Sequence, residues 1–272
     1  MSLSTYNKIA CGAHFTLGTF FSIFFPIINN NNPQSQNLRN QFALQDHNAL
    51  IQGNPIVVGW KSEPSIKTSL TTTQIMLIAF YYITSLFHGI YAYSDGIYPD
   101  MIKAKNNYLR WVEYAITSTL MINIIALLCT VKDTNAFILL NSCNVVMITL
   151  GQIVEENIRD GKSPIVPMAA SFFLLLSEFF VITRDYSRHV NQFSEYIKTN
   201  SISEPIPRWI TYMLIILFLF FACFGFVSLY QSMYPNTEYE FIEKIYIILS
   251  LVAKTTLGFF VAYGSAGGQQ RF

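Results

Sequence analysis

One lysine interrupts a long apolar segment near the C-terminal end of the sequence. Lys254 lies in ILSLVAKTTLGFF, residues 248–260, and the rest of that stretch suits a helix surrounded by hydrocarbon. A charged side chain at the centre of a bilayer costs about 2.5 kcal/mol or more, so such residues usually pair with an opposite charge and usually serve a function. Lys254 is therefore a candidate functional residue, and its partner should be an acid in another apolar segment.

Two acids and two histidines also lie inside apolar segments: Glu113, Glu178, His14 and His88. At 1.5 Å per residue, Glu113 is about 8 Å and Lys254 about 20 Å from the same end of their helices. Helical side chains lean toward the N-terminus, so these two long side chains can meet. His14 and His88 fall in the same half of the membrane as Glu113 and could line one polar cavity with it. Glu178 falls in the opposite half.

Each of these residues also has a purely structural interpretation. A buried lysine–glutamate pair can simply hold two helices together. A histidine on an apolar face is often a satisfied core residue, and Glu178 can bond to a neighbouring helix, with Arg184 near the same end. The residue types alone leave both interpretations open.

The composition indicates which elements carry these residues. Of the 272 residues, 52% are hydrophobic and only 12% are charged, whereas soluble domains have about 25% charged residues. A helix needs about twenty apolar residues to cross the hydrocarbon core. We expect one all-α domain over residues 1–272, a bundle of seven transmembrane helices. The predicted spans are 6–28, 71–94, 108–131, 134–156, 164–183, 207–231 and 241–263.

The connecting segments carry the turn-forming and polar residues. The first span is followed by residues 29–32, all Asn, and by Pro33 instead of a small-residue cleavage site, so we expect a membrane span and not a removable signal. The only long loop, 29–69, contains two short apolar stretches within residues 48–60, and we expect a short β-hairpin there. Lys and Arg are divided almost evenly between the two sides, with a slight excess that favours an N-terminus outside the cell.

Several function classes have no support in the sequence. The cysteines Cys11, Cys129, Cys143 and Cys223 lie in four different predicted spans and have no metal-binding spacing. We find no nucleotide-binding or hydrolase motif, and a net charge of +1 with scattered basic residues argues against a nucleic-acid surface. We therefore expect neither an enzyme, nor a metal site, nor nucleic-acid binding.

The segments around the buried charges resemble one known family. YIILSLVAK, residues 246–254, and RWVEYAITSTLMI, residues 110–122, resemble the seventh and third helices of heliorhodopsins. The segments NVVMITLG, GAHF and LFHG are similar to further parts of that family, and the resemblance covers essentially the whole chain. Other microbial rhodopsins normally carry an aspartate before the lysine in the seventh helix, where this chain has Ser250 one turn earlier.

The resemblance implies a retinal pigment. Lys254 would carry all-trans retinal as a protonated Schiff base, and Glu113 would be its counterion, because a buried cationic imine needs an adjacent carboxylate. His14 and His88 would be the two cavity histidines. The resemblance places further residues near the Schiff base or the polyene: Thr117, Ser250, Met121, Asn144 and Phe221.

It also implies an N-terminus in the cytoplasm and an extracellular C-terminus, against the slight charge excess, and a homodimer in the lipid bilayer. The sequence departs from the family pattern at Leu17, at Val227-Ser228 and at Glu178-Phe179. The additional carboxylate of Glu178 is what a proton path through the opposite half would need. Two functions stay open: a photosensor read by a signalling partner, and a light-activated conductor of protons.

Overall fold

The computed structural model describes residues 1–31, 70–94, 96–131, 133–200 and 208–266. Within these ranges all regular secondary structure is helical. Seven of the helices are long and apolar enough to cross a membrane. They are α1 (Leu3–Asn31), α3 (Leu70–Tyr93), α5 (Tyr108–Leu128), α6 (Thr134–Arg159), α7 (Ile165–Asn200), α8 (Arg208–Met233) and α9 (Tyr239–Ser265). The predicted hairpin at 48–60 lies outside the described residues.

The helices follow from the solvent that the apolar composition requires. In hydrocarbon every backbone N–H and C=O must be paired within the protein, and a helix achieves this within one segment. Hydroxyl side chains on the outer faces obey the same rule, because each donates to the carbonyl oxygen one turn earlier. These residues are Thr16, Thr19, Ser142, Thr149, Ser177 and Thr256. Their polar groups are thereby hidden from lipid.

Local signals set several helix ends. The Asn107 side chain accepts from the backbone N–H of Arg110 and caps α5, and Asp133 caps α6 in the same way. α6 ends two residues before Gly161, whose φ of 68° lies in the left-handed region that glycine adopts without steric cost. These ends fix where Arg110 and the last turn of α6 lie.

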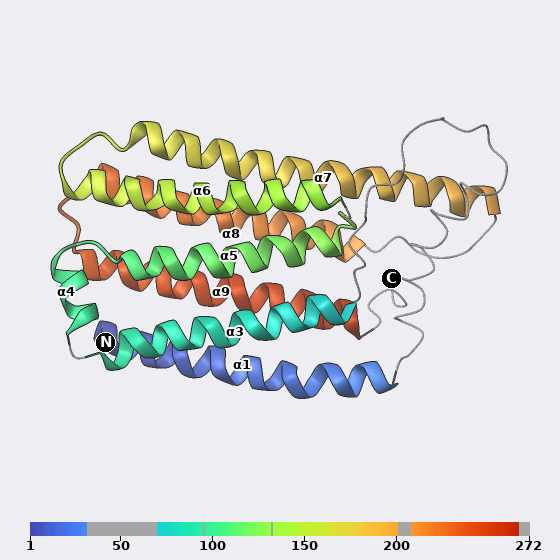
Figure 1. The fold of residues 1–272 in the computed structure, drawn as a ribbon, viewed down its shortest axis with the longest axis horizontal. Helices are drawn as coiled ribbons and strands as arrows, with labels where there is room; N and C mark the ends of the chain where they lie inside the picture. The colour runs from blue at the N-terminus through green and yellow to red at the C-terminus, as the bar shows by residue number, and fades with distance from the viewer. Residues whose placement is uncertain (32–69, 95, 132, 201–207, 267–272) are drawn as a thin grey trace.

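The long helices pack in chain order, and α9 closes the ring against α1. In Figure 1, α5 and α9 lie between the α1/α3 pair on one side and α6, α7 and α8 on the other. They are also the most buried helices, with 56% and 50% of their apolar windows inside the protein, against 22–39% for the others. The two helices that carry Glu113 and Lys254 are therefore central.

The main core lies between the central helices and their neighbours. Phe80 of α3, Ile125 of α5, Met213 of α8 and Leu257 of α9 are fully buried in one cluster. Because lipid is as apolar as these side chains, such helices are held by close van der Waals packing more than by exclusion from water. Tight packing around Lys254 and Glu113 restricts where a ligand can lie.

Two connecting segments differ from the prediction. The fifth span was expected to end at residue 183, but α7 continues to Asn200, and Figure 1 shows it extending beyond the other helices. Residues 184–200 are polar yet contain no glycine or proline, so nothing stops the helix where the apolar stretch ends. Tyr186 bonds to Thr211 of α8 at 3.1 Å. The predicted connection before α5 contains a short helix, α4 (Ile97–Lys103).

Candidate functional site

Lys254 and Glu113 meet in the centre of the bundle. The Lys254 Nζ donates to Glu113 Oε1 and to Thr84 Oγ1, each at 2.8 Å. All three residues are at most 3% exposed. A buried ion pair is stable only when its geometry is good and its remaining polar atoms are bonded, and removal of one partner leaves an uncompensated charge. The site therefore contains an amine poised beside a carboxylate and shielded from solvent.

Sequence reasoning did not identify Thr84 or Tyr81, which both bond to the lysine. The hydroxyl of Tyr81 donates to the backbone oxygen of Lys254 at 2.8 Å. Both residues lie on α3, and Thr84 is one helical turn before His88. The spacing of four between Thr84 and His88 places two polar residues on one face of an apolar helix, and that signal could have pointed to Thr84.

The two histidines lie together on the α1/α3 side of the lysine. The rings of His14 and His88 are nearly parallel, with centroids 5.7 Å apart. The His88 Nδ1 is 2.8 Å from Asn7 Oδ1, whereas neither ring nitrogen of His14 has a hydrogen-bond partner among the described residues. The ring of His14 is 5.8 Å from that of Tyr81. The structure brings the histidines together near Lys254, and their role in proton transfer stays a prediction.

A mostly apolar cavity opens on the other side of the lysine. It is bounded by α5, α6, α7, α8 and α9, with Lys254 in its wall. Of the residues that the resemblance implied, Thr117, Met121, Phe221 and Ser250 line this cavity. Asn144 lies one layer further out, where its amide donates to Ser118 Oγ and Thr119 Oγ1 at 2.8 Å.

Two glycines let aromatic rings close the cavity. A Cβ on Gly151 of α6 would lie 2.5 Å from the Trp111 ring, and one on Gly225 of α8 would lie 2.5 Å from the Phe172 ring. Since real Cβ atoms essentially never approach so closely, both rings rest directly against helix backbone. The cavity is therefore a slot between packed aromatic rings, with the Lys254 amine in its wall.

Glu178 stands apart from this site. It is 1% exposed on α7, and neither carboxylate oxygen has a hydrogen-bond partner among the described residues. The neighbouring Phe179 packs on Phe221 of the cavity wall, with ring centroids 5.6 Å apart. The structure shows no contact of Glu178 with Lys254 or Glu113. A buried carboxyl without partners is costly, so it usually has a specific role.

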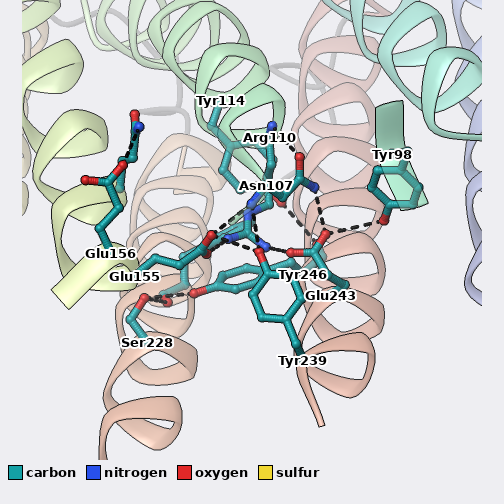
Figure 2. A network of polar contacts seen from close by, with 12 residues as sticks. Tyr98, Asn107, Arg110, Tyr114, Glu155, Glu156, Ser228, Tyr239, Glu243 and Tyr246 are labelled. Atoms are coloured by element: carbon teal, nitrogen blue, oxygen red, sulfur yellow. Dashed lines mark hydrogen bonds and ion pairs between the residues drawn. The ribbon is translucent and has the colours of Figure 1, made fainter. Parts of the chain in front are cut away.

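A second buried ionic group, which the sequence analysis missed, lies at the N-terminal end of the bundle. This is the end that holds the N-terminus of the chain and at which α5 and α9 begin. Figure 2 shows Arg110 of α5 between Glu155 of α6 and Glu243 of α9, and the guanidinium bonds to both carboxylates. We call these three residues the Arg110 cluster. All three are at most 3% exposed. The signal was present in the sequence, since one arginine and two acids occur near the ends of three spans on the same side.

Surrounding donors complete the Arg110 cluster. Glu155 Oε1 accepts from the Tyr239 hydroxyl at 2.8 Å and from the Asn107 backbone N–H at 3.1 Å. Glu243 Oε2 accepts from the Asn107 side chain at 2.8 Å and from the Tyr98 hydroxyl at 3.4 Å. Burial raises the pKa of Tyr98, so its hydroxyl stays protonated as a donor. Each of the four carboxylate oxygens therefore accepts at least one hydrogen bond.

Comparison with known proteins gives one family and one fold. Residues 34–266 match the family model described as Heliorhodopsin. No curated protein matches the sequence. The crystal structure of a light-driven proton pump, LR (Mac) from Leptosphaeria maculans, is similar with a TM-score of 0.61 and 9% identity, over 96% of this chain and 94% of that one. At that identity the similarity shows a shared fold.

Proposed function

The chain belongs to the heliorhodopsin family, and we propose that it is a photoreceptor in which light absorbed by a retinal bound to Lys254 drives a slow conformational signal without ion pumping. Family membership and the seven apolar helices make it an integral, multi-pass membrane protein of the retinal-binding rhodopsin type. The observation that carries the proposal is the contact of Glu113 with the Nζ of Lys254, a residue in the wall of an apolar cavity.

The residues present fit a retinal chromophore. Lys254 would hold it through an imine formed by the lysine amine with loss of water, and the polyene would supply absorption of visible light. The cavity offers apolar side chains such as Met121 and Phe221 to the polyene. Glu113, as a carboxylate 2.8 Å from the nitrogen, would stabilise the positive charge of the protonated imine. Thr84 accepts a second hydrogen bond from the Nζ of the free lysine. The protonated imine would have a single N–H, so Thr84 and Glu113 would be its two alternative acceptors.

The proton of the imine has nearby groups that could accept and return it. Glu113 is in direct contact with the nitrogen, and His88 lies one turn from Thr84 on α3. His14 stacks on His88 with both ring nitrogens free of partners among the described residues. We propose that the proton is displaced within this group and returns to the nitrogen, so no ion crosses the membrane.

Replacement of the lysine tests the proposal. We expect Lys254→Ala protein, incubated with retinal, to lack visible absorption because no amine remains in the cavity. Lys244→Ala is the matched control, since Lys244 lies on the same helix, is partly exposed and pairs with Glu240. Equal visible spectra for Lys254→Ala and the parent protein would refute the chromophore assignment.

Glu178 favours a second candidate function, a light-activated proton conductor. A carboxyl that is buried in the bundle and has no hydrogen-bond partner in the described part of the chain could take up and release a proton away from the Glu113 site. We expect Glu178→Gln to abolish any proton-gradient-dependent photocurrent in voltage-clamped cells and to leave the visible spectrum nearly unchanged. Photocurrents of equal size in variant and parent would exclude this path, and no photocurrent in the parent would favour the photosensor.

The remaining parts of the proposal come from the family resemblance. We propose that the bound isomer is all-trans retinal, that the N-terminus is cytoplasmic and the C-terminus extracellular, and that the protein acts as a homodimer with a separate signalling partner. The seven candidate membrane helices support termini on opposite sides of the membrane.

A further inference from the structure

The Arg110 cluster occupies the space between the cavity and the N-terminal end of the bundle. Arg110 is one helical turn before Glu113 on α5. Its guanidinium lies over the rings of Trp111, at 4.8 Å, and Tyr246, at 4.2 Å. Both rings line the cavity that also has Lys254 in its wall. One aromatic layer therefore separates the ionic group from the space proposed for retinal.

The cluster also holds several helices together. These helices can move relative to one another only if the bonds of the cluster break. Arg110, Glu155 and Glu243 come from α5, α6 and α9, and Tyr98 adds the short helix α4. The hydroxyl of Tyr246 bonds to Ser228 of α8 at 2.8 Å, which extends the connection to a fourth long helix. Figure 2 shows Glu155 and Glu243 directed at the guanidinium, with Tyr98 and Ser228 further out. Separation of the helix ends would require loss of charge-assisted hydrogen bonds, which are the strongest class in proteins.

The bonding of the cluster leaves one polar atom without a partner among the described residues, the Nε of Arg110. All four carboxylate oxygens already accept hydrogen bonds, and the two acids carry one more charge than the single guanidinium neutralises. The excess negative charge is stabilised by the N-terminal ends of α5 and α9, where backbone N–H groups carry partial positive charge. Glu243 lies near the start of α9, and Glu155 accepts directly from the N-terminal cap of α5.

We propose that the Arg110 cluster is a closed gate between the chromophore cavity and the N-terminal membrane surface, and that displacement of Trp111 and Tyr246 after illumination opens it. The proposal rests on the proposed function, because the displacement starts from retinal in the cavity. The gate serves either candidate function: its opening would expose a changed surface to a partner, or would give protons a path past Arg110.

Access of hydroxylamine to the imine tests the gate. Hydroxylamine is a small polar molecule that cleaves the imine, and loss of visible absorbance reports how readily it arrives. In the dark we expect Glu243→Gln pigment to bleach about tenfold faster than the parent, which corresponds to about 1.4 kcal/mol in the free energy of opening. Under continuous illumination the parent should approach the rate of the variant.

Two controls isolate the effect. Glu240→Gln changes an exposed acid one turn earlier on α9 and should bleach as the parent does. Gln74→Ala breaks a buried polar network with Asn29 and Ser265 at the opposite end of the bundle, so it shows what a general loss of stability does. Should Glu243→Gln fail to bind retinal, Glu155→Gln removes the other charge of the same cluster and gives the same test.

The outcomes separate the gate from the proposed function. Failure of the parent to form a visible pigment would refute both. A normal pigment whose Glu243→Gln variant bleaches at the parental rate would overturn the gate alone, and so would equal acceleration in Gln74→Ala. Faster bleaching confined to the variants of the Arg110 cluster would establish it.

Discussion

Replacement of Glu113 by glutamine should shift the absorption of the pigment to longer wavelength. The Lys254 Nζ, which marks the position of the imine nitrogen, lies 2.8 Å from Glu113 Oε1. At an effective dielectric constant of about 20, a full charge pair at that distance is worth about 6 kcal/mol. Light absorption moves positive charge away from the nitrogen, so the carboxylate stabilises the ground state more than the excited state.

The size of the shift follows from the same distance. If about half of the charge leaves the nitrogen, loss of the carboxylate charge lowers the transition energy by roughly 3 kcal/mol, or roughly 1,000 cm⁻¹. Glutamine has nearly the same shape and keeps a hydrogen-bond acceptor, so the substitution changes the charge with little change in packing.

The assay is the visible spectrum of purified pigment at constant pH and salt. Glu113→Asp retains the charge and should shift the maximum much less, and Glu240→Gln, an exposed acid on α9, should leave it unchanged. A maximum for Glu113→Gln within a few nanometres of the parent would refute the reasoning, because the carboxylate would then not be the charge nearest to the chromophore.

Two further predictions follow from the packing. Gly225→Ala places a Cβ 2.5 Å from the Phe172 ring, so pigment formation from added retinal should slow or fail. Gly12→Ala, whose Cβ meets no atom of the described residues within 4 Å, should match the parent, and equal rates for both variants would contradict the slot geometry. Tyr239→Phe removes the hydroxyl that donates to Glu155 and accepts from Asn107, so thermal unfolding of the pigment should show a loss of about 1–3 kcal/mol, and an unchanged midpoint would mean that these bonds contribute nothing to stability.

Some polar contacts of the site could be predicted from the sequence, and others could not. The meeting of Lys254 with Glu113 could be predicted, because each is the conspicuous charge in an apolar helix and helix geometry gives its depth. Thr84 is less evident, because its spacing from His88 marks a polar face of α3 but its hydrogen bond with the lysine forms only when α3 packs against α5 and α9. The roles inferred for Thr117, Met121, Phe221 and Ser250 remain predictions, although these residues line the cavity.

The sequence by itself determined the solvent, the helical fold and the charges that lie inside apolar stretches, because each of these depends on composition and on segments read one at a time. Backbone hydrogen bonding in hydrocarbon leaves helices as the solution for seven apolar segments. Only the tertiary structure decided which polar residues are partners. Arg110, Glu155 and Glu243 each read as an ordinary charge near a helix end, and they form one buried cluster because the packing of α5, α6 and α9 brings those ends together.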